Sequence, residues 1–502
     1  MKKYLLLIYI CITALSISGC KKAIDENIKP SNDKTDSEVL KTLDGITTAT
    51  NGTYSLLVTQ NARDFPYNQT WFHMSEFKGN NLFAVTQAYP AYKDDGYTYT
   101  NSPTQGITPS FWKMSYRVIF SANKVIDAIS DGKGAEYDQL KGENYFLRAL
   151  AYFNMARVYA PPYYQNSETN LAVPLSLSSN IDNSYKPARN TVKEVYAQVI
   201  ADLEKAAALM TKEKSNNYAS KESAWALLSR VYLYMSGTAT QPNITYCNKA
   251  IEYADKVIAS PRFVLAQDQD YASAFAKDSR TNNEFIFAFS HDATNGNFIN
   301  DFLTPKNFYG YYIGGEYAAS PDYIAILDQN AADLRHSFVR ADNDPRSPNP
   351  APNRYTITKY DFEQTDQSGY TTQSKSGTVY LRLAEMYLNK AEALAKKGLN
   401  SDALVPLNVI RTRAKAPEWT NASLGTAGMN AFQATLNERR LELAWEGHGT
   451  YDDFRNGLPM KRFYTDYFHT DPLTIEATDK RVPYPIPLEE IKMNGNLKQN
   501  PL

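Results

Sequence analysis

Two carboxylates near the C-terminal end of the chain have the spacing of a possible acid and base. Glu442 and Glu446 are four residues apart, so a helix would carry both on one face, and glycosidases use paired carboxylates. Such a pair must flank a sugar, which adjacent turns of one helix rarely do. Glu438 and Arg439 precede Glu442 by four and three residues, a spacing typical of ion pairs on a helix surface. We therefore interpret this run as structural.

Other chemistry finds little support. His448 with Asp452 and Asp453 could ligate a metal, but hydrogen bonding at a helix end is the preferred interpretation. The sequence contains no G-x-S-x-G elbow, phosphate-binding loop, G-x-G-x-x-G fingerprint or H-E-x-x-H zinc motif. The sequence thus predicts a protein that is not an enzyme and that has no cofactor and no metal site.

The first residues predict export. Lys2 and Lys3 precede an apolar stretch, residues 4–17, that is too short for a membrane-spanning helix of roughly 20 residues. Ser18 and Gly19 then lead to Cys20, as in a bacterial lipobox. We predict a signal peptide over residues 1–19, lipid on Cys20, and a polar tether over residues 20–41. Several acyl chains on one residue would hold the protein stably on a membrane.

Charge and cysteine content exclude other classes. The net charge of −1 gives no electrostatic footprint for nucleic acid. Of the three cysteines, Cys11 leaves with the signal peptide and Cys20 carries lipid, so Cys247 cannot form an intrachain disulfide. Cys247 lies in a helical pattern, and we expect it to be a small buried residue.

Helical periodicity dominates the remainder, residues 42–502, which we interpret as a single domain. Apolar residues recur at helical spacing in residues 147–159, 224–235 and 384–395. Further helices are expected at about 111–130, 191–210, 244–259, 401–414 and 430–447. Residues 224–257 and 380–410 resemble each other, each with a glycine between two helices (Gly237 and Gly398) and small alanines opposite larger residues. This pattern is typical of tetratricopeptide units, although an ordinary helical domain would also fit.

Long segments without a clean period separate these helices, chiefly residues 60–110, 160–190, 261–377 and 415–428. They are rich in aromatic residues, which argues against disorder and favours binding. The alternation of Phe285, Phe287 and Phe289 predicts a strand that packs inward. The residues that we predict to contact a ligand come from segments 65–112 and 285–323: Trp71, Asn80, Asn81, Tyr89, Tyr92, Tyr309, Tyr311 and Tyr312. Aromatic rings can cover the apolar faces of sugars, while amides and hydroxyls meet their oxygens.

The C-terminal motifs resemble those of the SusD/RagB family, the nutrient-binding outer-membrane lipoproteins of Bacteroidetes. The matching stretches are Tyr380–Ala393 with Leu407–Ala414, Glu438–His448 with Asp452, and Pro485–Pro487 with Gln499–Pro501. Upstream, Trp112, Ala122–Ile126 and Arg148–Tyr159 fit as well, so the resemblance covers the mature chain, with the C-terminal signature at about 280–502. Two departures stand out. Family members often have arginine where this chain has Gly449, and Phe77–Asn81 lacks an expected aspartate.

The resemblance implies a mainly helical, tetratricopeptide-like scaffold with long irregular loops and a few short strands that form the binding face. It implies a surface-exposed lipoprotein of the outer membrane that captures an oligosaccharide for a SusC-like TonB-dependent transporter. The alternatives are a peptide ligand of the RagB type, a surface glycosidase or protease, and a helical scaffold that binds only protein. An enzyme would need measurable turnover, and a scaffold would need no aromatic loops.

Overall fold

The computed structural model describes residues 36–59, 65–86, 95–104, 106–182, 184–275, 277–289, 306–308, 311–313, 316–342, 351–360 and 377–501. The chain separates into a short unit of residues 1–46 and a large unit of residues 47–502. The short unit holds α2 (Asp36–Val39) and the first residues of α3 (Leu43–Ser55). The predicted signal peptide and Cys20 lie outside the described residues. Among the described helices, none combines the length and the apolarity of a membrane span.

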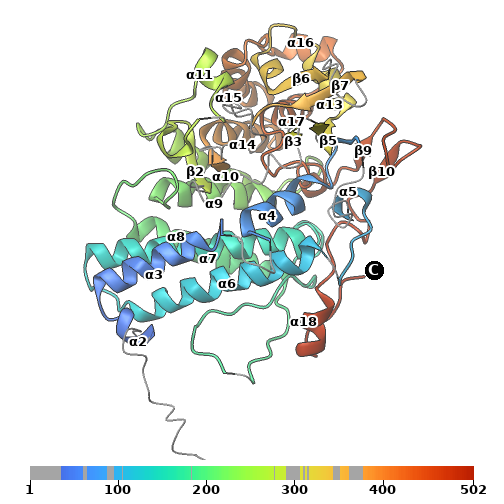
Figure 1. Ribbon diagram of the computed structural model, residues 1–502. Coiled ribbons are helices and arrows are strands. Elements are labelled where there is room, and N and C mark those ends of the chain that lie inside the picture. The colour runs from blue at the N-terminus through green and yellow to red at the C-terminus, as the bar shows by residue number, and fades with distance from the viewer. Residues whose placement is uncertain are drawn as a thin grey trace, which may run out of the picture. The chain divides into compact units, whose positions relative to one another are not determined.

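The large unit is built on packed helices, as predicted (Figure 1). Consecutive long helices pack against each other: α6 (Ile107–Ala128), α7 (Ala135–Tyr159), α8 (Val192–Leu209), α9 (Lys221–Met235) and α10 (Ile244–Ile258). The pair α14 (Leu383–Lys396) and α15 (Asn400–Arg413) continues this stack, with α14 packed on α10. The fold is therefore mainly helical and tetratricopeptide-like.

The two predicted repeat units are helical hairpins, α9 with α10 and α14 with α15. Alanines at their contacts, including Ala224, Ala250, Ala391 and Ala403, are fully buried and let the helices approach closely. Gly398 follows α14 with a φ of 78°, a left-handed conformation that glycine adopts without strain. The sequence therefore predicted both the helices and the stop between them.

A helix that the sequence did not indicate is α4 (Tyr67–Glu76), in the segment predicted to be a binding loop. Every residue of α4 is buried. Polar side chains are buried in this helix together with the apolar ones, so burial is not matched by an apolar sequence. Polar residues such as Asn68 and Thr70 made the segment look like a loop.

The helix expected over residues 430–447 is shorter than predicted, because α17 spans Ala431–Glu442. The next residues turn away, with Trp445 and Gly447 at φ values of 61° and 79°. The left-handed backbone at Trp445 is strained, and its burial holds it there. The Trp445 Nε1 donates to the Asn81 carbonyl oxygen at 3.2 Å, and its ring lies 4.7 Å from that of Tyr323.

Short strands and helices complete the unit. An antiparallel sheet has the order β1 (Leu82–Ala84), β5 (Tyr317–Ala319), β7 (Ala351–Ile357) and β6 (Val339–Asp342). Three antiparallel pairs are β2 (Phe285–Phe289) with β8 (Thr378–Arg382), β3 (Lys306–Phe308) with β4 (Tyr311–Ile313), and β9 (Met460–Arg462) with β10 (Leu473–Ile475). All of β2 is buried, which confirms the inward-packing strand. The shorter helices are α5 (Asp95–Thr98), α11 (Asp268–Ala272), α13 (Pro321–Leu327), α16 (Asn421–Thr426) and α18 (Leu488–Met493), with the 3-10 turns η2 (Ser279–Thr281), η3 (Leu334–Phe338) and η4 (Phe454–Asn456).

The carboxylates Glu442 and Glu446 belong to a buried network of charges rather than to a helix surface. The Arg382 guanidinium donates to Glu284 at 2.8 Å, to Glu442 at 2.6 Å and to Glu446 at 2.7 Å, and all four side chains are buried. Burial opposes the charge of Glu442, but Arg413 and Arg382 hold the pKa of its carboxyl well below the usual range. A carboxylate that is permanently charged and enclosed by arginines cannot serve as a general acid.

The predicted surface ion pairs of this run are therefore wrong. Glu438 pairs with Arg335 at 2.7 Å and with Arg411 at 2.6 Å, and Arg439 lies 3.2 Å from Asp452. These partners come from other elements, because the face of α17 that carries Glu438 and Arg439 packs against α14, α15 and η3. Glu438 and Arg439, which the sequence suggested lie on a solvated face, are instead buried inside the C-terminal half of the chain.

Candidate ligand-binding face

The two predicted segments meet in the structure, but Trp71 does not lie on their surface. β1 pairs with β5, so segments 65–112 and 285–323 are neighbours. Trp71 is fully buried in α4, with its ring 5.4 Å from that of Phe289 and 5.1 Å from that of Tyr380. The prediction that Trp71 contacts ligand is therefore corrected, because a ring enclosed on all sides has no surface to offer.

Asn80 and Asn81 follow α4 and differ in what their side chains can do. The Asn81 Oδ1 accepts from Arg440 Nε at 2.8 Å and the residue is buried, so this amide already serves the fold. Asn80 is half-buried, and its Nδ2 donates to the Lys461 carbonyl oxygen at 3.2 Å. The Asn80 side chain is thus accessible, whereas the Asn81 side-chain oxygen is already bonded to Arg440.

The side chains of the five predicted tyrosines are not among those that the structure describes. Tyr89, Tyr92 and Tyr309 lie outside the described residues. Tyr311 and Tyr312 lie in β4, of which only the backbone is described. Ligand contact by these tyrosines stays a prediction.

Aromatic residues that the prediction missed extend the face beside β1. The β9–β10 hairpin carries Phe463 and Tyr467, whose exposed fractions are 69% and 57%. The Tyr467 amide donates to the Ala84 carbonyl oxygen at 3.2 Å, which joins the hairpin to the end of β1. Figure 1 shows β9 and β10 beside α5 and β5. The run Phe463–Phe468 is aromatic, polar-flanked and non-periodic, so the criterion applied to the other two segments would have found it.

A buried arginine, Arg462, anchors the β9–β10 hairpin to the rest of the unit. Arg462 donates to the carbonyl oxygens of Gly79 at 2.9 Å, Phe77 at 3.0 Å and Tyr97 at 2.9 Å. Its guanidinium carbon also lies 3.7 Å from the centre of the Tyr97 ring. An arginine held by three carbonyl groups fixes the hairpin against the end of α4, so the exposed rings stand on a preorganised base.

A polar cavity of about 110 Å³ opens between Asn80 and α17. Arg440 and Asp453 both line it without forming an ion pair among the described residues. Burial raises the pKa of Asp453 to about 6, against the lowering effect of Arg440. Because water occupies about 30 Å³ per molecule in the liquid, the cavity admits a few waters or the hydroxyl edge of a ligand, but not a whole drug-sized molecule.

The two departures from the family pattern lie against each other in space. A Cβ placed on Gly79 would stand 2.4 Å from the Gly449 carbonyl oxygen, and one on Gly449 would stand 2.7 Å from Glu76 Oε1. The Glu76 carboxylate accepts from the backbone amides of Trp445 at 3.3 Å, Gly447 at 3.0 Å and Gly449 at 3.3 Å. Gly79 and Gly449 therefore mark a close backbone approach between segment 77–81 and the loop after α17, and this approach leaves no room at 449 for the arginine that family members often have there.

The predicted alternative of a metal at His448 also finds no support. Among the described residues, no three His, Cys, Asp or Glu side chains gather as a metal site. His448 is buried, and burial together with nearby arginines lowers its pKa well below the usual value. Asp452 instead lies 2.7 Å from Arg455 and 3.2 Å from Arg439.

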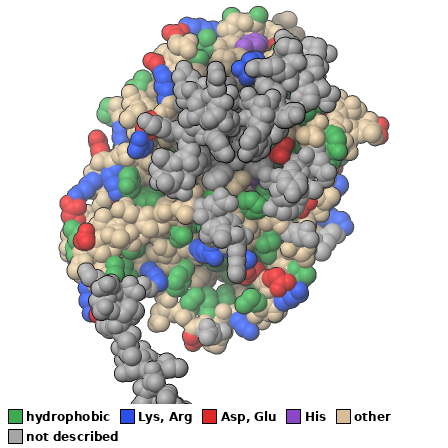
Figure 2. All heavy atoms as spheres, in the orientation of Figure 1, with side chains coloured by type: hydrophobic (Ala, Val, Ile, Leu, Met, Phe, Trp, Pro, Cys, Tyr) green, Lys and Arg blue, Asp and Glu red, His purple; other side chains and the backbone are tan. Residues whose placement is uncertain are grey.

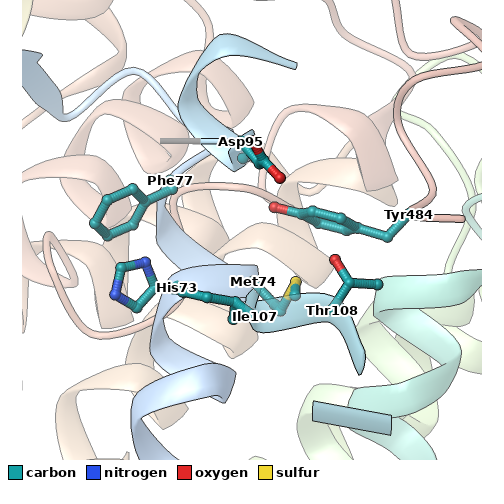
Figure 3. A pocket seen from close by; sticks show the side chains of 8 residues that line it. His73, Met74, Phe77, Asp95, Ile107, Thr108 and Tyr484 are labelled. Atoms are coloured by element: carbon teal, nitrogen blue, oxygen red, sulfur yellow. The ribbon is translucent and has the colours of Figure 1, made fainter. Parts of the chain in front are cut away.

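A second opening, between α4 and Tyr484, is too small for a ligand. Figure 3 shows His73, Met74 and Phe77 on one side and Asp95, Thr108 and Tyr484 on the other. Its volume of about 10 Å³ holds at most one water. The cavity is therefore a packing defect rather than a binding site.

Charge on the visible surface is mixed in sign. Figure 2 shows lysine and arginine side chains interspersed with aspartate and glutamate among the described residues on that side. No broad patch of one sign is seen among those described residues.

Comparisons with known proteins agree with this architecture. A family model described as "Starch-binding associating with outer membrane" matches residues 32–233, and one described as "SusD family" matches residues 267–502. SusD-like protein P2 of Formosa agariphila is 26% identical, with 100% of this chain and 99% of the relative covered.

Solved structures give the same result. A SusD superfamily protein from Bacteroides thetaiotaomicron is 27% identical, with a TM-score of 0.75 over 92% of this chain and 100% of the other. Another from Bacteroides vulgatus is 25% identical, with a TM-score of 0.76 over 92% and 99%. The similarity therefore covers nearly the full length of each relative.

Proposed function

The chain belongs to the SusD/RagB family, and from that premise we propose that it captures an oligosaccharide at the cell surface and passes it to a SusC-like TonB-dependent transporter. Members of the family are non-catalytic binding proteins, and the family is associated with the outer membrane. The protein is accordingly a binding protein and not an enzyme. Its ligand, its transporter and its lipid anchor belong to the proposal.

The observation that carries the proposal is the exposure of Phe463 and Tyr467 on the hairpin to which Asn80 is bonded through the Lys461 carbonyl oxygen. Two aromatic rings in water on an anchored hairpin are unfavourable unless something covers them, and sugar rings present apolar faces of suitable size. Asn80 supplies an amide at the same edge for sugar hydroxyls. The predicted tyrosines at 89, 92, 309, 311 and 312 would extend this platform.

The membrane part of the proposal rests on the N-terminal sequence. A lipidated Cys20 followed by the polar residues 21–41 would tether residues 42–502, proposed as one domain, to the outer membrane. Contacts between the N-terminal and C-terminal halves of the chain support the interpretation of residues 42–502 as one domain. Arg230 in α9 donates to Glu385 in α14 at 2.6 Å, and Glu76 in α4 binds the amides after α17.

A binding screen tests the ligand. The mature chain, purified in detergent, is titrated by calorimetry with maltohexaose, laminarihexaose, xylohexaose and a set of peptides, and the mixtures are checked for cleavage products. Removal of an aromatic ring at the centre of a site can cost ~2 kcal/mol, a factor of about 30 in affinity. Phe463→Ala and Tyr467→Ala should therefore weaken glycan binding about 30-fold without lowering the melting temperature.

Phe120→Ala is the matched control, because Phe120 is an exposed phenylalanine on α6. It should leave affinity unchanged. Binding of peptides in place of glycans would favour the RagB alternative for the ligand class, and reproducible product formation would contradict a pure binding role.

The transporter is tested by purifying the lipoprotein from outer membranes and identifying the proteins that remain bound to it. Absence of any TonB-dependent transporter would remove that part of the proposal.

A further inference from the structure

A larger cavity, of about 290 Å³, lies on the other side of α17 from the polar cavity at Asn80. It is lined by the end of α13, the segment after α15, α16 and α17, which lie in the upper part of Figure 1. Asn437 of α17 lines both cavities. The volume is at the lower end of the range for small-molecule sites, so it suits one ring rather than a long chain.

One wall of this cavity is Trp419, which is half-buried and rigidly held. The Asn408 side chain bonds both backbone groups of Trp419, accepting from its amide and donating to its carbonyl oxygen, each at 2.9 Å. Arg411 lies 4.7 Å from the ring centre and donates to the Pro417 carbonyl oxygen at 2.7 Å. The Trp419 backbone is therefore fixed, and Arg411 covers one face of its indole, before any ligand arrives, which lowers the entropy cost of binding to the other face.

The rim of the cavity offers hydrogen-bonding groups without a large net charge. Within the part of the chain that the structure describes, the Gln329 amide and the Asn437 Oδ1 have no hydrogen-bond partner. Among the same described residues, Glu418 accepts from Thr412 through one oxygen at 3.0 Å. The charge of Arg411 is balanced by Glu438 at 2.6 Å. A fixed aromatic ring with amide and carboxylate groups around it matches the apolar face and the hydroxyl edge of a neutral sugar.

We propose that this cavity is a second carbohydrate subsite, in which one sugar residue stacks on Trp419 and its hydroxyls bond Gln329, Glu418 and Asn437. The sugar class rests on the proposed function, but the site is separate from the face formed by Phe463, Tyr467 and Asn80. An oligosaccharide-binding protein with two subsites would hold long or branched chains better than short ones, because linked binding events reinforce each other.

Fluorine NMR reads this site directly. The mature chain in detergent is labelled with 5-fluorotryptophan, and the Trp419 signal among those of the five tryptophans is assigned with Trp419→Phe. Maltohexaose, laminarihexaose and xylohexaose are the probes. The Trp419 signal should shift saturably with at least one of them. Gln329→Ala and Glu418→Gln should each raise the dissociation constant from that shift about tenfold.

Trp225→Ala is the matched control, since Trp225 is also half-buried but lies in α9 away from the cavity. It should leave the Trp419 titration unchanged. If calorimetry detects a glycan whose binding Phe463→Ala and Tyr467→Ala weaken, yet the Trp419 signal does not move, the second subsite is overturned and the proposed function stands. If no probe gives heat or a shift, the proposal of glycan capture fails for these glycans and the second subsite is rejected with it.

Discussion

Replacement of Glu442 by glutamine should destabilise the protein strongly without affecting any chemistry. Glu442 is fully buried, accepts from Arg382 at 2.6 Å and from the Tyr271 hydroxyl at 2.9 Å, and is bonded by Arg413 as well. Glu442→Gln keeps the shape but removes the charge that balances these arginines. Loss of one partner of a buried ion pair costs ~3–5 kcal/mol, because the remaining charge is uncompensated.

That loss is a large share of the 5–15 kcal/mol that typically separates folded from unfolded proteins. Urea unfolding followed by circular dichroism should show it as a lower midpoint. Glu489→Gln is the control, because Glu489 forms an exposed pair with Lys492 at 2.8 Å, and surface pairs contribute at most about 1 kcal/mol. A Glu442→Gln variant within about 1 kcal/mol of the wild type would refute the structural role of the network.

The pH dependence gives a second check on the same residue. The folded pKa of Glu442 lies far below its ordinary value of 4.5, so its contribution to stability is complete above pH 4.5 and is lost as the pH falls below it. The difference in stability between wild type and Glu442→Gln should therefore be constant from pH 5 to 8 and shrink below pH 4.5. A difference that grew on acidification would contradict the assignment.

Three further results are expected. Burial raises the pKa of Glu76 to about 7, so its ionisation destabilises the folded state as the pH rises from 4.5 through 7, by ~3 kcal/mol in full. Glu76→Gln should flatten the resulting fall of the urea midpoint with pH. If the slope of midpoint against pH is unchanged in the variant, Glu76 is excluded as its source. Trp71→Ala should lower the free energy of unfolding by ~3–5 kcal/mol while the folded fraction binds ligand as before, and a loss of affinity at unchanged stability would restore Trp71 to the ligand face. Cys20→Ala should move the protein from the membrane to the soluble fraction, and mass spectrometry that found an unmodified N-terminus elsewhere would contradict lipidation.

The sequence predicted those parts of the fold in which apolar residues recur at helical spacing. Helices α7, α9 and α14 show this spacing although nearly all of their residues are buried, and α10 shows it beside a partly exposed face. Helix α4 was missed because polar residues such as Asn68 and Thr70 are buried in it together with the apolar ones, and Trp71 was misplaced with it. A helical pattern depends on where the apolar residues stand, and not on whether the helix has an exposed face.

Contacts between distant residues were beyond sequence reasoning. Glu442 pairs with Arg382, 60 residues away, and Glu438 pairs with Arg335, 103 residues away, whereas local spacing suggested partners within one turn. Trp419 and the pair Phe463 and Tyr467 were accessible to the criterion of aromatic residues in polar, non-periodic stretches. That criterion identifies exposed aromatic residues only when the stretch is not a buried helix, which sequence alone did not distinguish here.

The close approach of Gly79 and Gly449 has a consequence for how this chain can evolve. A side chain introduced at 79 would meet the Gly449 backbone, and one introduced at 449, including the arginine that family members often have there, would meet Glu76. A larger residue at 79 therefore requires the loop after α17 to move away from α4, and that movement would also make room at 449. The two positions form an epistatic unit.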